Sequence, residues 1–448
     1  MADSRRRPLL WVLAAALVVT GVAAAHFKTS NPSTLANALN VNGVESSALY
    51  CTGLSSANGG VEGHVVFLNT SSGPRTVLAN VVSDTHRSAS VTLHVAAYSS
   101  KSLSPASLVS GNSYAVAAEA IGGGVVGEEV TGAGAAEVPC TSAGVRRWYG
   151  AGFDTVVGSS AALSIYNPTA TPAVLDVTTF SSNGFGAPAA FRGLSLAAHT
   201  QIELNLGPQI VNTSNVGVHV SVLRGSLVVV GVQKSGAVAS LVPGSRSTAS
   251  EAWFPRVTTA LNAVAQLRVA NPGSRSVNVT VNVGLAPYHV APLTLSVAPY
   301  SSGQVVISPN PAIPNHGYAT VKLTSSAPVI ASLTTGTTAG IALSSPEPPG
   351  EEFLISDFAG RRLDAATVTN TSTQTLDVNF RVVGAGGATG SASLKGGATE
   401  SILGIFSGVS TLSGKSLLVT SSRPVLLVAA TLPSNPRGVA VVAPLDGR

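Results

Sequence analysis

The side chains of this sequence that could carry chemistry are few: two cysteines, eight histidines and a sparse set of carboxylates. Cys51 and Cys140 are the two cysteines, and an isolated pair in an oxidising compartment is most simply one disulfide. Closing so long a loop is worth about 4–5 kcal/mol in the chain-entropy model. Because two thiols alone cannot complete a zinc site, the sequence predicts a Cys51–Cys140 disulfide.

The histidines are not spaced as metal ligands. No two of them lie three or four residues apart, the spacing that places two ligands on one face of a helix. His64, His86 and His94 lie near Asp84 in the sequence and could converge across strands. Solvated strand or loop positions are the simpler interpretation, so we expect no metal site and no cofactor.

The carboxylates gather in two places. Glu128 and Glu129 lie on or just after a predicted strand, and a second group at 347–364 surrounds a predicted linker. Oxygen ligands from a linker suit Ca²⁺, although a solvated acidic linker is the simpler interpretation. With so few acids, the carboxylate pair of a glycosidase is hard to assemble.

Two further motifs resemble catalytic loops only formally. The glycine-rich run 122–127 fits G-x-G-x-x-G, but a dinucleotide site needs that loop to open a helix, and a valine strand follows here. Gly111–Ala115 is the nearest approach to a nucleophile elbow around Ser113. We expect both to be turns of β-hairpins, and we expect no catalytic residues and no enzyme activity.

The composition excludes a nucleic-acid partner. Only 10% of the residues are charged, and the net charge is +5. Three of the positive charges stand together at Arg5–Arg7, and no longer basic run follows them, so the basic stripe of a nucleic-acid site is missing.

The N-terminus has the order of an export signal. Arg5–Arg7 precede an uncharged apolar stretch, Leu9–Ala25, that ends in Ala23-Ala24-Ala25. We expect residues 1–28 to be a cleaved signal peptide or an uncleaved transmembrane signal-anchor helix, and residues 29–48 to be a polar stalk. The remainder would lie on the extracytoplasmic face of the cell membrane, or be secreted after cleavage.

The elements that must position these side chains come from one pattern repeated four times. Each copy has an Asn that closes an alternating run before a polar turn, an aromatic upstream and an apolar pair downstream, in register. The Asn side chain can bond the backbone two residues on. The asparagines are Asn69, Asn167, Asn271 and Asn370, and the aromatics are Tyr50, Trp148, Trp253 and Phe353.

Within a copy the hydrophobic period is two. The valines at 277, 279, 281 and 283 alternate with Asn and Thr, which predicts strands with one buried face. Six or seven short strands per copy are typical of a two-sheet sandwich, whereas a single four-bladed propeller would need blades about half this size. The predicted fold is therefore all-β, with four tandem immunoglobulin-like β-sandwich modules at 49–145, 146–250, 251–350 and 351–448.

The two tryptophans of the repeats, Trp148 and Trp253, recur at module starts. We expect them to pack in the core or between modules. Stacking against a sugar is the alternative interpretation of these side chains.

One stretch carries a family resemblance. Trp148-Tyr149, then residues 163–168, 194–206, 218–220 and 228–230, resemble an actinobacterial family of secreted or membrane-anchored envelope proteins of unknown function. The resemblance implies an exported, tethered protein and carries over no functional residues. Phe353 replaces Trp in the fourth copy, which is a departure from the pattern.

These patterns favour a non-catalytic, extracytoplasmic structural or interaction protein that displays β-sandwich modules at the cell envelope. The alternative is an accessory protein that binds envelope polysaccharide. The expected partners are the membrane, through the N-terminal helix, and an envelope glycan or protein.

Overall fold

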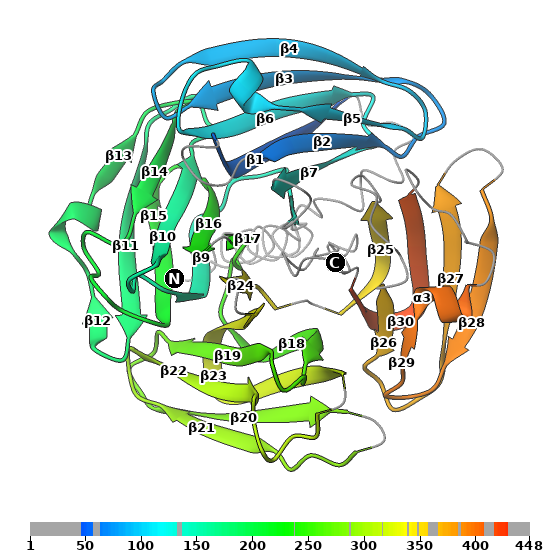
Figure 1. Ribbon diagram of the computed structural model, residues 1–448. Helices are drawn as coiled ribbons and strands as arrows, with labels where there is room; N and C mark the ends of the chain where they lie inside the picture. The colour runs from blue at the N-terminus through cyan, green and yellow to red at the C-terminus, as the bar shows by residue number, and fades with distance from the viewer. Residues whose placement is uncertain are drawn as a thin grey trace, which may run out of the picture. The chain divides into compact units, whose positions relative to one another are not determined.

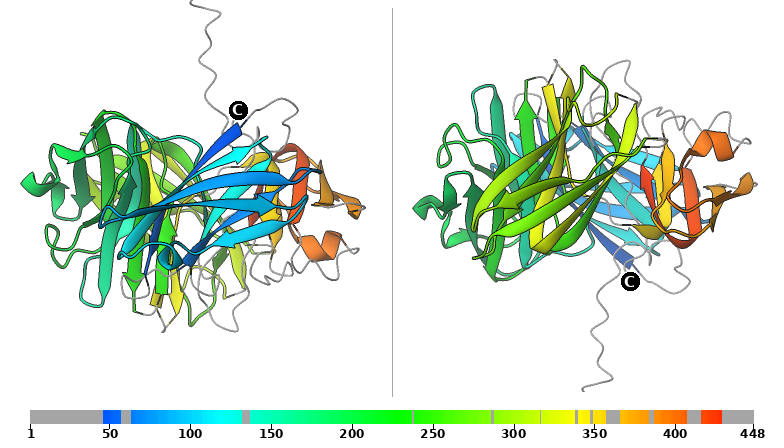
Figure 2. Two further views of the ribbon diagram at one scale, coloured as in Figure 1. Left: turned by 90° about the horizontal axis from the view of Figure 1, so that it is seen from above. Right: turned by 90° about the horizontal axis from the view of Figure 1, so that it is seen from below.

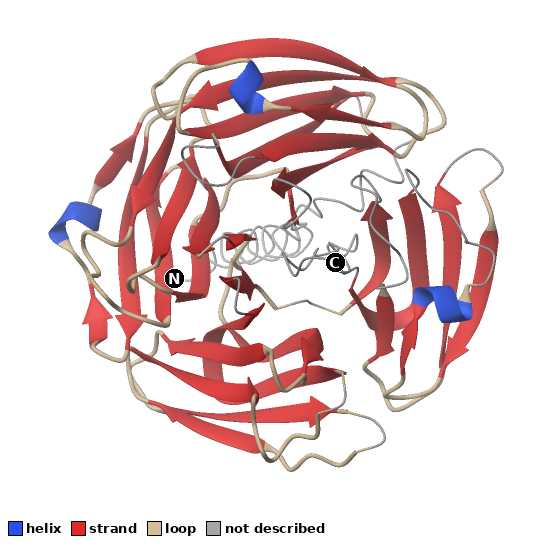
Figure 3. Cartoon of the chain, viewed as in Figure 1, coloured by secondary structure: helices blue, strands red, loops and turns tan. Residues whose placement is uncertain are grey.

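The fold is all-β, as predicted (Figures 1 and 3). The computed structural model describes residues 46–56, 63–131, 137–236, 238–285, 288–315, 317–337, 340–346, 349–356, 366–383, 387–406 and 416–428. Within these ranges, helical structure is limited to η1 (Pro105–Ser107), η2 (Ala189–Phe191) and α3 (Ile402–Ile405), and no helix is long and apolar enough to span a bilayer. The expected signal or anchor helix at 1–28 lies outside the described residues.

Residues 46–139 form two antiparallel sheets with the strand orders β1-β6-β3-β4 and β5-β2-β7-β8 (blue to cyan in Figures 1 and 2). β1 begins earlier than the predicted module, inside the expected stalk at 29–48, because Ser46 and Ser47 pair with Ile121 and Ala120. The strands are β1 (Ser46–Ser55), β2 (Gly63–Asn69), β3 (Arg75–Ser83), β4 (Ser88–Val95), β5 (Ser100–Leu103), β6 (Ser113–Ile121), β7 (Val125–Thr131) and β8 (Glu137–Pro139).

Residues 147–242 repeat this arrangement. One sheet has the order β12-β11-β15-β9, with β13 also on β11, and the other has the order β14-β10-β16-β17. The strands are β9 (Arg147–Phe153), β10 (Ser159–Tyr166), β11 (Ala173–Ser181), β12 (Gly184–Gly186), β13 (Leu194–Leu196), β14 (Gln201–Asn205), β15 (Val216–Arg224), β16 (Val228–Ser235) and β17 (Val238–Val242).

In the last two stretches, one long strand runs through both sheets. The first half of β23 pairs with β18 and β20, and its second half pairs with β19 and β24; β30 pairs in the same way with β25 and β27, then with β26. The strands are β18 (Ala249–Thr258), β19 (Val264–Asn271), β20 (Val277–Gly284), β21 (Leu293–Val297), β22 (Ser301–Ser308), β23 (Tyr318–Thr337), β24 (Gly340–Ser344), β25 (Gly350–Ser356), β26 (Thr367–Asn370), β27 (Leu376–Val383), β28 (Thr389–Leu394), β29 (Thr399–Ser401) and β30 (Ser416–Val428).

The same strand order therefore recurs in all four stretches, except that the described residues of the fourth include no counterpart of β8, β17 and β24. This order corrects the prediction of a β-hairpin at the glycine-rich run. The glycine-rich turn at 122–124 joins β6 to β7, but these strands belong to different sheets and do not form a hairpin. All three glycines have φ between +64° and +83°, a region that favours glycine because it has no Cβ. The turn passes the chain from one sheet to the other, a step that β23 and β30 make without a turn.

The apolar faces of the two sheets in each stretch meet in one core. The core of the first stretch includes Val65 and Val125 from one sheet with Val81 and Val116 from the other. The other three stretches have corresponding clusters. The predicted disulfide is present: Cys51 on β1 bonds to Cys140, just after β8, so it joins the two sheets.

The four repeated asparagines are fully buried, and each makes the same hydrogen bonds. The Asn167 Nδ2 donates to the backbone oxygens of Thr171, Leu196 and Ala197, at 2.9–3.1 Å, and its Oδ1 accepts the N–H of Thr169. Asn69, Asn271 and Asn370 repeat this set at their own positions. The predicted bond to the residue two positions on is confirmed in all four, and we call this arrangement the asparagine clamp.

The clamp links the two sheets of the first stretch. Asn69 ends β2 in one sheet, while its acceptor Val95 ends β4 in the other. The amide therefore satisfies buried backbone oxygens that the ladders leave open, and such groups are costly when unpaired. It also ties the turn after the second strand of each stretch to the end of the strand that carries the other acceptors: β4, β13, β21 or β28.

Replacing Asn167 with Ala should leave buried backbone oxygens without their hydrogen-bond donor. The free energy of unfolding should therefore fall by about 3 kcal/mol. Urea unfolding followed by tryptophan fluorescence measures this, because Trp148 lies in the same core. Thr169→Val is the matched control, since its hydroxyl reaches only the Asn167 Oδ1 and the Thr171 oxygen, and it should cost about 1 kcal/mol or less. Equal losses for the two variants would contradict the role of the clamp.

Candidate functional site

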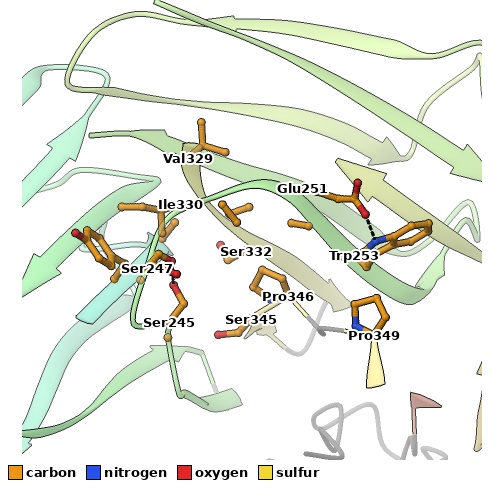
Figure 4. Close-up of a pocket in the computed structure, with 17 residues that line it drawn as sticks. Ser245, Ser247, Glu251, Trp253, Val329, Ile330, Ser332, Ser345, Pro346 and Pro349 are labelled. Atoms are coloured by element: carbon orange, nitrogen blue, oxygen red, sulfur yellow. Dashed lines mark hydrogen bonds between the residues drawn. The ribbon is translucent and has the colours of Figure 1, made fainter. Parts of the chain in front are cut away.

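A cavity with a volume of about 380 Å³ lies beside β9, β18 and β23 (Figure 4). The segments that follow β17 and β24 complete it. Its walls contain backbone and side chains from two consecutive stretches of the repeat, so it exists because the second and third copies pack together.

The cavity has an apolar wall and a hydroxyl-bearing rim. Val329, Ile330 and Ala331 of β23 supply the apolar part, while Ser245 and Ser345 lie opposite (Figure 4). The Ser245 Oγ donates to the backbone oxygen of Ser247. Pockets of this kind hold an apolar body and orient it with a few polar groups.

Trp253 and Glu251 stand at one edge of the cavity (Figure 4). The Trp253 indole N–H donates to the Glu251 carboxylate at 2.7 Å, and the Lys322 ammonium lies 3.0 Å from the same carboxylate and 4.6 Å from the indole centroid. The three side chains hold one another in place before any ligand arrives.

The Glu251 carboxylate is ionised over a wider pH range than usual. Its partial desolvation acts to raise its pKa, but the hydrogen bonds from Lys322 and Trp253 and the charge of Lys322 outweigh this, so the pKa is lowered. Glu251 is therefore an acceptor at neutral pH. It is the one carboxylate among the described residues of the cavity wall, which include no histidine.

The two tryptophans have different environments, which corrects their shared interpretation. Trp148 is 2% exposed and donates its indole N–H to the Pro243 oxygen, so its predicted core position is confirmed. Trp253 is partly exposed, and its neighbours Ala252 and Phe254 face the core instead. Strand pairing shifts register in β9 and β18, and one residue of slip moves a side chain to the opposite face.

A buried ion pair lies where the second and third stretches meet. The guanidinium of Arg268 on β19 is 3.8 Å from the carboxylate of Asp154, and both residues are buried. Asp154 also accepts the backbone N–H of Asn215, whose amide reaches the Gly303 oxygen. This network fixes one stretch on the next, because breaking a buried pair leaves an uncompensated charge.

Glu129 is a buried acid that the sequence analysis placed only near a strand. It is 1% exposed, and its Oε2 has no hydrogen-bond partner. One of its oxygens lies within 4.8 Å of both Cys51 and Cys140 sulfurs, and it borders a second cavity of about 130 Å³. The sulfurs are bonded to each other, so this group is not a metal-ligand set as it stands. The alternation of side chains along β7 places Glu129 on the same inward face as Val125. This alternation is the sequence feature that could have predicted the burial of Glu129.

Burial raises the pKa of Glu129 well above its usual range, although a hydrogen bond from the Thr52 backbone acts in the opposite direction. An acid in such a site is most stable when protonated. Burial therefore favours the protonated form of Glu129 in the core of the first stretch.

The remaining sequence candidates are dispersed. His64 is on β2 and His94 on β4, in different sheets, and His86 lies in the turn between β3 and β4. Ser113 begins β6, where it is buried and accepts a hydrogen bond from Gln201. His219 stacks on Tyr149 with ring centroids 4.4 Å apart. In the acidic linker, Glu347, Asp357 and Asp364 lie outside the described residues.

Comparison with known proteins points to one sequence family. The family described as "Family of unknown function (DUF5719)" matches residues 95–334, more than half of the chain. This agrees with the expectation of a family without an assigned activity. No curated protein matches the chain.

Two solved structures show weak similarity. A tetra-tandem repeat from the extending region of a large adhesion protein is 12% identical, with 89% of this chain and 99% of that chain covered and a TM-score of 0.13. A GH78 family rhamnosidase of Bacillus sp. GL1 is 10% identical, with 86% and 54% covered and a TM-score of 0.14. Scores this low establish no shared fold.

Stability should depend on pH through Glu129. Because its pKa is higher in the folded than in the unfolded chain, its contribution to stability is complete below the unfolded pKa and is lost as the pH rises through the folded value. Glu129→Gln should remove that loss. Between pH 4 and pH 8, the free energy of unfolding of this variant should therefore rise relative to that of the wild type.

The matched control is Glu128→Gln, because Glu128 is the neighbouring side chain on the opposite face of β7. Its unfolding free energy should keep the pH dependence of the wild type. Parallel pH profiles for Glu129→Gln and the wild type would show that Glu129 does not titrate abnormally.

Proposed function

We propose that this chain, which belongs to the DUF5719 family of unknown function, is a non-catalytic structural or interaction protein. In this proposal, four tandem immunoglobulin-like β-sandwich modules at 49–145, 146–250, 251–350 and 351–448 are displayed on the extracytoplasmic side of the cell membrane. The N-terminal segment 1–28 delivers the chain there and either anchors it or is cleaved.

The observation that carries the proposal is the fourfold recurrence of strand order with the asparagine clamp. Each copy also has a cluster of buried side chains, and the first of these clusters extends to Val230, Val232 and Leu241 of the second stretch. The contacts that hold each copy together are repeated, whereas the exposed side chains differ between copies. This pattern is typical of a scaffold that presents variable surfaces. Function in such scaffolds lies on sheet faces and loops.

Polar contacts between consecutive stretches support modules that are fixed rather than freely jointed. The hydroxyls of Thr52 and Ser164 are 2.6 Å apart, and the Leu343 N–H donates to the Ser240 Oγ. Both contacts are buried, as is the Arg268–Asp154 pair. Buried polar contacts of this kind favour one packing arrangement over others.

The location is testable in cells that express the native chain. Limited proteolysis of intact cells should degrade residues after 28, and N-terminal sequencing of the membrane and medium fractions should show whether the chain begins at residue 1 or near residue 26. A chain that resists external protease and fractionates with the cytosol would contradict the proposal.

A second candidate, an accessory protein that binds envelope polysaccharide, is favoured by the outward position of Trp253. Partly exposed aromatics on a β-sheet provide flat apolar surfaces with a polar handle. Incubating the exported chain with isolated cell-wall fractions should pellet it with at least one of them. Failure to pellet with any fraction would remove this candidate and leave the first one standing.

A further inference from the structure

We infer that the outer face of strands β21, β20, β23 and β18, centred on Trp253, binds an uncharged oligosaccharide. This inference rests on the second candidate function and assigns its site and ligand class. We call the surface the Trp253 face and define it by Glu251, Trp253, Thr280, Asn282, Lys322 and Thr324.

The strand register places these side chains in two adjacent rows. Trp253, Lys322 and Asn282 are directly paired across β18, β23 and β20. The next row contains Glu251, Thr324 and Thr280, and it continues to Thr294 on β21. Neighbouring strands lie about 4.8 Å apart, so each row offers polar groups at regular intervals beside one aromatic ring.

The side chains on the opposite side of the same strands point into the core, so the two rows point outward. Phe254, Val281, Val321 and Leu323 alternate with the residues of the Trp253 face and are buried among apolar neighbours. Asn282 and Thr294 are exposed, while Trp253, Lys322 and Thr324 are partly exposed. A substitution on the Trp253 face therefore leaves the core intact.

The chemistry of the face suits a sugar chain. An aromatic ring attracts the polarised C–H groups of a pyranose for the same reason that it attracts the Lys322 ammonium: its face carries partial negative charge. Around it, the Glu251 carboxylate accepts hydroxyl hydrogens, the Lys322 ammonium donates, and the Asn282 amide does both. The indole is already fixed by Glu251 and Lys322, so little ordering is required on binding.

The charges argue for an uncharged ligand. Glu251 and Lys322 neutralise each other at 3.0 Å, and the other members of the face are Asn and Thr. Among the six residues that define the face, an acidic polymer would meet no excess positive charge, and the nearby Arg256 lies over the ring of Tyr318. The apolar cavity of about 380 Å³ opens beside Trp253, and its serine hydroxyls extend the polar rim.

The corresponding faces of the first two stretches pack against the stretch that follows each of them. Tyr50, on the outer side of β1, packs against Tyr166 of the next stretch. Tyr149, on the outer side of β9, joins Ala151 and Phe180 against Ala270 and Ile330 of the third stretch. The residue paired with Tyr50 is Ala117 on β6, and the residue paired with Tyr149 is His219 on β15. At the same position of the third stretch, Trp253 is paired with Lys322 on β23. The third face is polar where the first two are packing surfaces.

The test is binding of the exported chain to insoluble mannan, glucan, galactan and chitin, with polygalacturonate as the charged comparison. Wild-type protein should be retained by at least one neutral polysaccharide, and Trp253→Ala should bind it about tenfold or more weakly. Trp253→Phe should recover part of the affinity, because the ring is restored without the N–H.

Tyr98→Ala is the matched control, since Tyr98 is an exposed aromatic in the first stretch, and it should bind as the wild type does. Circular dichroism melting of each variant shows whether it is folded; if Trp253→Ala is not, Glu251→Gln replaces it and should weaken binding severalfold.

Three results would overturn the inference. Equal binding by wild type and Trp253→Ala would move the site elsewhere but keep polysaccharide binding. Binding to polygalacturonate alone would refute the uncharged class. No binding by the wild type to any of these polymers would reject both this site and the second candidate function, without touching the structural proposal.

Discussion

One buried amide per repeat is the interaction on which the rest of the structure depends. In the second stretch, for example, the asparagine clamp joins the end of β10 to the turn that follows it and to the end of β13, across the two sheets. An amide is the group that can do this, because it offers two donors and an acceptor in one plane. With the clamp in place, the side chains outside the core are free to differ between copies.

That freedom is visible where consecutive copies meet. The first joint uses tyrosines and a pair of hydroxyls, and the second uses an apolar cluster around Phe180 and Ile330 with a buried Arg268–Asp154 pair. In the third copy the equivalent face carries the exposed Glu251 with the partly exposed Trp253 and Lys322. The same scaffold position thus packs in two copies and presents polar groups in another, which is how a repeat protein can gain a binding surface without changing its core.

The all-β class, the asparagine bonds and the disulfide could be predicted from sequence because each depends on local periodicity or on a unique pair. The environments of the aromatics could not. Tyr50 and Trp148 stand equally far from their asparagines, yet Tyr50 faces outward and Trp148 inward, because irregular pairing in β1 and β9 shifts the register. Long-range proximity was equally hidden: nothing in the spacing brings Glu129 to the Cys51–Cys140 bond. The glycine turn at 122–124 was placed correctly, but which sheet receives β7 is a tertiary property.

The central claim is that four asparagine side-chain amides are buried and hydrogen-bonded to the backbone. Hydrogen exchange of the side-chain amides in protein labelled with ¹⁵N-asparagine measures this directly. Asn69, Asn167, Asn271 and Asn370 should exchange orders of magnitude more slowly than an exposed amide such as Asn278, each assigned by the loss of its signal on substitution. Exchange of these four at the rate of Asn278 would contradict the account.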